Sequence, residues 1–242
     1  MNTNLILLLA ALLLGLSKGG LGGPVPGALV APLLSSAMPV SQAVGLTLPL
    51  FILGDAFALP VYWRKWEARH IRLMLPAAVV GIVMGILLLA TLPDLVLRRL
   101  LGLFSLVAVL YKLASDSLPR LAYQPRNWHG YLAGWASGFS SALANAGAPP
   151  FTAYLLLQRV TPTAFIGTSI LFFALVNLVK LPGFLAANVL DPRQLLGVAW
   201  VVPVIPLGVW LGRRALLWID ARTFERFMLF LLFLAALSLL LG

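Results

Sequence analysis

The chain of 242 residues contains no cysteine, which excludes structural disulfides and thiolate-ligated metal sites. Charge is also scarce, because charged residues make up 10% of the chain and only seven residues are acidic. The two histidines, His70 and His129, lie in basic loops, where we expect them to face solvent or lipid headgroups. No pair of histidines or carboxylates has the spacing of metal ligands, so we expect no metal and no other cofactor.

Hydrophobic residues fill the chain instead: they make up 61% of it, and the mean hydropathy is +1.00. Both values lie outside the range of soluble domains. The net charge of +10 comes from short basic clusters between apolar runs, so we expect these clusters to meet anionic lipid headgroups and not nucleic acid. The sequence predicts an all-α polytopic membrane protein in which residues 1–242 form a single membrane domain.

The sequence repeats itself in two halves. At an offset of about 122 residues the matched pairs are Gly45 with Gly167, Asp55 with Asn177, and Pro60 with Pro182. At an offset of about 127 the pair Gly81 and Gly85 matches the pair Gly208 and Gly212. An ordered series of glycine, proline and polar matches indicates a duplication, with repeat one at about 1–118 and repeat two at about 119–242.

Six apolar runs are long enough to cross a bilayer: Ser41–Trp63, Leu73–Thr91, Leu95–Leu113, Thr163–Ala186, Leu195–Leu211 and Thr223–Leu241. Two other apolar segments, Gly15–Leu34 and Gly138–Leu157, are interrupted by glycine and proline. A continuous helix over Leu5–Leu34 would be about 45 Å long, against a hydrocarbon core of about 30 Å, and its glycine run would not hold a helix together. Each interrupted segment is therefore predicted as two half-helices joined by a tip.

The positive-inside rule bears on whether these hairpins cross the membrane or return to the side they entered. If both cross, lysines and arginines divide almost evenly between the two faces. If both are re-entrant, one face keeps only Arg98, Arg99 and Arg193, and nearly all the others gather on the opposite face. Each half is therefore predicted as a re-entrant helical hairpin plus three transmembrane helices. The halves are inverted repeats because each crosses an odd number of times, and both termini are extracytoplasmic.

Non-helical backbone at membrane depth persists only where protein buries it or where it lines a wet cavity. The half-helices that start after the two tips direct free amides and partial positive charge toward the tips, which suits an anion. The candidate substrate-binding residues are Ser17, Lys18, Gly19, Gly20, Gly22 and Gly23 in the first tip, and Ser140, Ser141, Asn145 and Gly147 in the second. The alternative is that these small residues only permit close helix packing, the role we expect for Gly81, Gly85, Gly208 and Gly212.

Ionisable residues at membrane depth are candidates for function. Lys18 is the first of them, with snorkelling to an interface as its alternative. Asp55 and Asn177 each lie 14 residues into a predicted span, about 21 Å along a helix, so both are expected inside the core. Asp55 is interpreted as a proton carrier, as the partner of Lys18 or as a purely structural residue, and Asn177 as a packing residue. Lys180, also a coupling or gating candidate, is expected to snorkel outward.

Several motifs resemble a known family. Residues 15–23 read Gly-Leu-Ser-Lys-Gly-Gly-Leu-Gly-Gly and precede Ala31-Pro32-Leu33-Leu34, while residues 144–150 read Ala-Asn-Ala-Gly-Ala-Pro-Pro and precede Tyr154-Leu155-Leu156. These segments resemble the two signatures of the sulfite exporter TauE/SafE family of permeases, and the stretch Phe165–Pro182 is also similar to it. The resemblance covers essentially the whole chain. It implies a transporter of sulfite, sulfoacetate or other organosulfur anions in a bacterial-type inner membrane, with duplicated halves.

Together these features predict a secondary transporter, not an enzyme. Its alternating-access site would be formed near the midplane by the two hairpin tips, with a small anion as the partner. One alternative is an intramembrane enzyme acting on a lipid phosphate, which would need acid and base groups beside the anion site. Another is an uncoupled, channel-like or assembly protein. The compound, the direction of flux, the coupling ion and the oligomeric state, including a possible homodimer, stay open.

Overall fold

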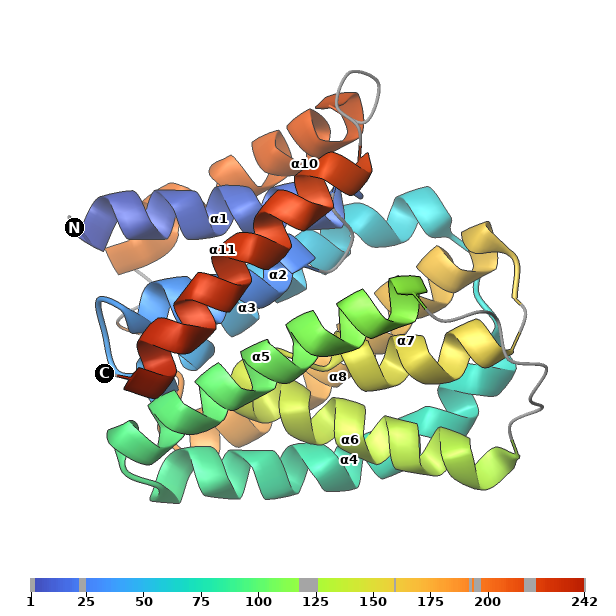
Figure 1. Cartoon of the computed structure of the whole chain (residues 1–242), viewed down its shortest axis with the longest axis horizontal. Helices are drawn as coiled ribbons and strands as arrows, with labels where there is room; N and C mark the ends of the chain where they lie inside the picture. Colours follow the sequence, from blue (N-terminus) through green and yellow to red (C-terminus); the bar gives the residue numbers. More distant parts are fainter. Residues whose placement is uncertain are drawn as a thin grey trace.

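The computed structural model describes residues 3–21, 25–117, 126–158, 160–191, 193, 197–215 and 221–241 (Figure 1). Within this part of the chain the elements are α1 (Thr3–Lys18), α2 (Val25–Ser35), α3 (Val40–Ala58), η1 (Leu59–Tyr62), α4 (Ala68–Thr91), α5 (Asp94–Ser117), α6 (Asn127–Ala144), α7 (Ala148–Leu157), α8 (Pro162–Ala186), η2 (Ala199–Val201), α10 (Val204–Ala215) and α11 (Ala221–Leu241). The prediction of an all-helical protein is confirmed for the described residues, which include no strand.

Three stretches are long and apolar enough to cross a membrane: Val40–Tyr62, Ala68–Thr91 and Thr163–Ala186. They coincide with three predicted spans. Helices α5 and α11, with 24 and 21 residues, also reach a spanning length of about 30 Å. The run predicted over Leu195–Leu211 is not one regular helix, because the chain passes through η2 and a turn at Pro203 before α10 begins. Proline lacks the backbone N–H that a continuous helix would need there.

The interruptions at the two tips are present. Helix α1 ends at Lys18 and is followed by a turn in which Gly20 has a positive φ of 98°. Helix α6 ends at Ala144, and the residue that caps it, Asn145, is left-handed with φ of 52°. The second arms are short, since α2 has 11 residues and α7 has 10, so each is only about 15 Å long, half of a hydrocarbon core.

The outer surface is apolar. Large side chains that face outward include Val80, Leu87, Leu110, Phe227 and Phe230, each of them more than half exposed. Exposed apolar surface of this extent needs a covering of similar polarity, which lipid supplies. The exposed faces and the long apolar helices together indicate a membrane protein.

Glycines let two helix pairs approach closely, as we expected for the Gly81/Gly85 and Gly208/Gly212 pairs. A Cβ on Gly81 would lie 2.2 Å from the Trp135 carbonyl oxygen, so α4 packs backbone to backbone against α6. A Cβ on Gly208 would lie 2.9 Å from the Gly15 Cα, so α10 packs in the same way against α1. Small residues give membrane helices the close van der Waals contact that holds them together.

Gly138→Ala is expected to destabilise the protein by about 1–3 kcal/mol, as overpacking does elsewhere. The new Cβ would lie 2.1 Å from the Ala78 carbonyl oxygen, a backbone atom that cannot turn aside. Gly197→Ala is the matched control, because its Cβ meets nothing within 4 Å. Thermal unfolding of both variants in detergent provides the comparison, and equal midpoints would contradict the packing role assigned to Gly138.

Candidate functional site

An ion pair joins the first tip to the last turn of α3. Lys18 is the last residue of α1, where a cation also offsets the partial negative charge of the helix end. Its Nζ donates to Asp55 Oδ1, and the side chains are only 13% and 3% exposed. Gly54 makes room for this contact, since a Cβ there would lie 3.0 Å from Lys18 Cγ. The centroid of the Phe51 ring lies 5.5 Å from Lys18 Nζ, within the range of a cation–π contact.

Asp55 also joins α3 to α8. Its second carboxylate oxygen, Oδ2, accepts a hydrogen bond of 2.8 Å from Asn177 Nδ2, and both residues are buried. Asp55 therefore has a partner on each oxygen and lies in the core, as the depth along its helix predicted. Of the roles considered for it, this geometry is that of a counter-ion to Lys18.

Lys180 is completely buried, so the prediction that it snorkels outward is wrong. It lies one helical turn beyond Asn177 and therefore on the same face of α8, which is turned toward α3 and the second hairpin. Its Nζ donates to Ser141 O at 3.2 Å, to Ser141 Oγ at 3.1 Å and to Asn145 Oδ1 at 2.9 Å. All three acceptors are neutral and lie at the end of α6, so the tip covers the end of this side chain.

The second tip reaches α3 through Asn145. The left-handed backbone of Asn145 turns its amide toward both Lys180 and Thr47, and its Nδ2 donates to Thr47 Oγ1 at 2.5 Å. Thr47 also donates to the Val44 carbonyl at 2.8 Å, so its hydroxyl both donates and accepts. Thr47 lies two turns before Asp55 on the same helix.

Other residues of the second tip stabilise the turn itself. Ser137 Oγ donates to the Gly147 carbonyl at 2.6 Å across the break between α6 and α7, a link that the sequence did not indicate. Ser140 Oγ donates to the Ala136 carbonyl at 2.7 Å within its own helix. Of the candidates in this tip, Ser141 and Asn145 join the polar cluster, whereas Ser140 and Gly147 bond locally.

The first tip divides in a similar way. Lys18 joins the cluster, and Ser17 Oγ lies where a Cβ on Gly27 would be 3.1 Å away, between the two arms of the hairpin. Gly19 is a packing residue, since its Cβ would lie 2.5 Å from the Val209 carbonyl. Gly20 supplies the turn through its positive φ. Gly22 and Gly23 fall outside the described residues.

His70 does not face solvent as expected. It is buried, and its Nδ1 lies 3.4 Å from the Tyr154 hydroxyl, so the expectation of a solvated or headgroup-facing role is wrong. The first turn of α4 points this residue inward toward α7, whereas Arg69 and Arg72 on either side of it are exposed. His129 caps the start of α6, where its Nδ1 accepts from Arg126 N at 3.0 Å.

The cluster thus brings two ammonium groups, one carboxylate, two amides and two hydroxyls to the contact of α3 and α8 with both tips. Among the described residues no group of three histidines or carboxylates is placed to hold a metal ion. A positively charged, hydrogen-bonding cluster of this kind is suited to a small anion.

Comparison with known proteins accounts for nearly the whole chain. Residues 7–239 match the family described as Sulfite exporter TauE/SafE. No curated protein and no solved structure matches the chain. The matched region includes both tips and all the residues of the polar cluster. The chain belongs to the sulfite exporter TauE/SafE family, whose members are membrane transporters of sulfur-containing anions and not enzymes.

Proposed function

We propose that this protein is a secondary transporter of small sulfur oxyanions, such as sulfite or the organosulfonate sulfoacetate. The site is the polar cluster between the hairpin tips: Lys18, Asp55, Asn177, Lys180, Ser141 and Asn145. The observation that carries the proposal is that two lysines, the largely buried Lys18 and the fully buried Lys180, lie in one cluster that holds a single carboxylate, Asp55. Backbone amides of the tips, with Ser17, Ser140 and the tip glycines around them, complete the proposed binding surface.

The charge balance of the cluster favours an anion as the substrate. Lys18 pairs with Asp55, whereas Lys180 has only neutral acceptors, so with both lysines protonated the cluster carries one excess positive charge. An unpaired charge away from water is costly, and the negative charge of a bound anion would offset it. The oxygens of a sulfite or sulfonate group accept hydrogen bonds in several directions, which fits donors that arrive from α1, α6 and α8.

The packing supports two inverted repeats, at about 1–118 and 119–242. Asp55 and Asn177 are matched residues of the halves, and they bond to each other. The matched glycine pairs are used reciprocally: α4 of repeat one packs on the second hairpin, and α10 of repeat two packs on the first. In Figure 1, α1 and α6 run in opposite directions along the bundle, as inversion requires.

We infer that each hairpin is re-entrant and that the protein lies in the inner (plasma) membrane with both termini extracytoplasmic. The support comes from the short second arms α2 and α7, and from Figure 1, where both chain ends lie at one end of the bundle. Reporter fusions after Ser117 and after Asn188 are expected to lie on opposite sides, cytoplasmic and extracytoplasmic respectively. Both fusions on the same side would refute this arrangement.

Transport requires the site to open. Asp55, Asn177 and Lys180 are each at most 4% exposed, so an anion reaches them only when the packed elements separate. Rocking of the two halves about the contact of α3 and α8 would uncover the cluster first from one side and then from the other. Whether Asp55 also carries a coupling proton is a further part of this proposal, to be tested by the dependence of flux on a pH gradient.

The test is counterflow of labelled sulfite and sulfoacetate in liposomes, with hydrolysis of a lipid phosphate measured in parallel. We expect saturable counterflow and no hydrolysis. Lys18→Ala is expected to reduce uptake by at least about tenfold, because a charged hydrogen bond to the anion is lost. Lys112→Ala is the control, since Lys112 pairs with Glu225 away from the cluster. Hydrolysis without counterflow would favour the enzyme alternative.

A further inference from the structure

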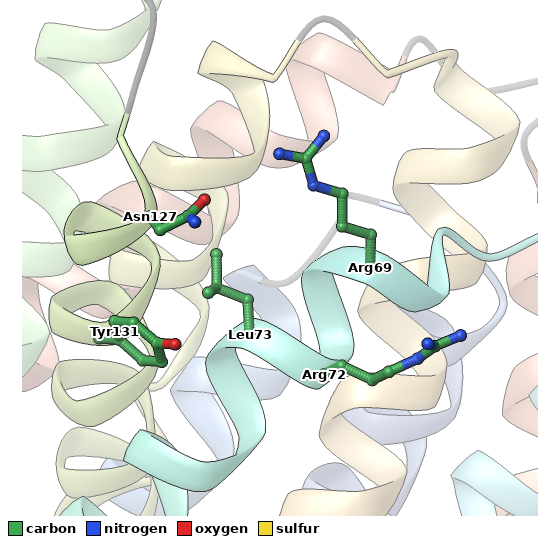
Figure 2. Close-up of a pocket in the computed structure, with 5 residues that line it drawn as sticks. All are labelled: Arg69, Arg72, Leu73, Asn127 and Tyr131. Carbon is green, nitrogen blue, oxygen red and sulfur yellow. The ribbon is translucent and has the colours of Figure 1, made fainter.

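A hollow of about 350 Å³ lies between the first turns of α4 and α6, lined by Arg69, Arg72, Leu73, Asn127 and Tyr131. Figure 2 shows Leu73 and Tyr131 facing each other between the two helices, with Arg69 on the side where Asn127 lies and Arg72 extending outward at the other border. Asn127 is 17 residues before Ala144, the end of α6. The hollow is therefore about 26 Å along the helix from the second tip, and it is separate from the transport site.

The helices around the hollow are parallel and begin together. Contacts along the two helices run in the same order: Leu73, Met74 and Ala78 of α4 lie against Gly130, Gly134 and Gly138 of α6, respectively. The two helices therefore run in the same direction. Two adjacent helix N-termini concentrate partial positive charge at one end of the pair. The two partial positive charges repel each other at the N-terminal end of the α4–α6 pair, and an anion placed between them would reduce this repulsion.

The side chains at the hollow are hydrogen-bond donors. The side chains of Arg69 and Arg72 form no ion pair or hydrogen bond with any other residue in the described part of the chain. Asn127 adds an amide and Tyr131 a hydroxyl. Glu67, the residue before α4, is the nearby carboxylate, and its backbone N–H bonds to Thr168 Oγ1. Guanidinium groups bind phosphate oxygens in pairs, so the donors match a phosphate better than a simple halide.

The surface next to the hollow is apolar. Val80 and Val83 of α4 and Leu132 of α6 are each more than half exposed, and Trp128 and Tyr131, in the first turns of α6, are each at least half exposed. Tryptophan and tyrosine are typical of the membrane–water interface. A ligand bound here would meet hydrogen-bond donors at its polar head and apolar side chains along the adjoining helix surface. This combination favours a phospholipid over a free anion.

One hydrogen-bond acceptor, a backbone carbonyl of α4, narrows the choice of lipid headgroup. Pro76 lies inside α4 and has no N–H, so the carbonyl of Arg72, four residues earlier, lacks its helical donor. A headgroup hydroxyl could donate to that carbonyl. An ammonium headgroup could donate as well, but two arginines would repel it. The preferred headgroup is therefore anionic and carries hydroxyl groups.

We propose that the hollow between α4 and α6 is a binding site for an anionic phospholipid with a hydroxyl-bearing headgroup, such as phosphatidylglycerol. Arg69 and Arg72 bind its phosphate, Asn127 and Tyr131 add hydrogen bonds, and the exposed faces of α4 and α6 carry its acyl chains. The bound lipid offsets the charge of two parallel helix N-termini and so stabilises the α4–α6 pair.

The test uses the full chain, purified in detergent and depleted of lipid. Phosphatidylglycerol, phosphatidylethanolamine and phosphatidylcholine are added in equal amounts, and the retained lipid is measured by native mass spectrometry together with the shift in unfolding temperature. We expect phosphatidylglycerol to be retained about tenfold over phosphatidylcholine, and Arg69→Ala/Arg72→Ala to remove most of that preference. Arg213→Ala/Arg214→Ala is the control, because it removes a similar pair at the end of α10.

Three outcomes would overturn the proposal: equal retention of the three lipids, an equal loss of preference in the control variant, or a stabilising shift from inorganic phosphate with none from phosphatidylglycerol. If the alanine variant does not fold, Arg69→Lys/Arg72→Lys replaces it in the test. This variant keeps the charge and loses the planar guanidinium groups, so we expect it to retain phosphatidylglycerol to an intermediate extent. The transport proposal is independent of every result here.

Discussion

Replacing Asp55 with alanine is expected to lower the free energy of unfolding by about 3–5 kcal/mol, the usual cost of removing one partner from a buried ion pair. The carboxylate accepts from Lys18 on one oxygen and from Asn177 on the other. Its loss leaves a buried ammonium group without a counter-ion and an amide without its acceptor. Unfolding of the purified variant in mixed micelles, followed by circular dichroism, measures the effect.

A second substitution separates the charge from the packing. Asp55→Ala/Lys18→Met is expected to recover most of the lost stability, because replacing both partners of a buried pair by apolar groups is often neutral. Asp94→Ala is the control: Asp94 accepts from Val40 N and from Arg98 Nε, but its side chain is 40% exposed. Removing the Asp94 carboxylate should lower the free energy of unfolding by less than Asp55→Ala does. Equal decreases for Asp55→Ala and Asp94→Ala would contradict the importance of the buried pair.

Lys180→Met is expected to weaken sulfite binding by about 10-fold to 100-fold, the worth of one charged hydrogen bond. The substitution removes the ammonium group that has no carboxylate of its own, and with it the excess positive charge that an anion would offset. Methionine has a similar length and fits an apolar site. The dissociation constant, measured by isothermal titration of sulfite into the purified protein, gives the result.

Lys180→Met should affect the free energy of unfolding less than it affects sulfite binding. Lys180→Met removes the ammonium donor from three neutral oxygens of Ser141 and Asn145, of which the Ser141 carbonyl keeps the Asn145 N–H as a donor. The substitution leaves no buried charge unpaired, so it should cost less stability than Asp55→Ala. Lys112→Met provides the control for removing a lysine elsewhere. An unchanged dissociation constant in a folded Lys180→Met protein would exclude Lys180 from the binding site.

Local rules predicted much of the fold. Hydropathy located the spans over α3, α4 and α8, and the glycine and proline runs located both breaks. The depth of Asp55 and Asn177 along their helices, together with their match in the repeat, placed both residues in the core. These features depend only on composition and spacing within one segment, so they can be predicted from a single sequence.

Lys180 could not be placed in this way, because its surroundings come from another part of the chain. A position near the end of a long helix is normally near lipid headgroups, but the end of α6 folds over it and supplies Ser141 and Asn145 as acceptors. The link from Ser137 to Gly147 depends in the same way on how the hairpin closes. The break before α10 was missed because the apolar composition of that run outweighed Pro203.

The bond between Asp55 and Asn177 also bears on how such a molecule could arise. On the proposed duplication, these positions descend from one ancestral residue. Two aspartates facing each other would place like charges at bonding distance, and two asparagines would leave Lys18 without a counter-ion. A dimer of identical ancestral chains would have had to accept one of these two penalties. If the halves arose in this way, joining the copies in one gene would let the facing positions mutate separately, so that one side could keep a carboxylate and the other an amide.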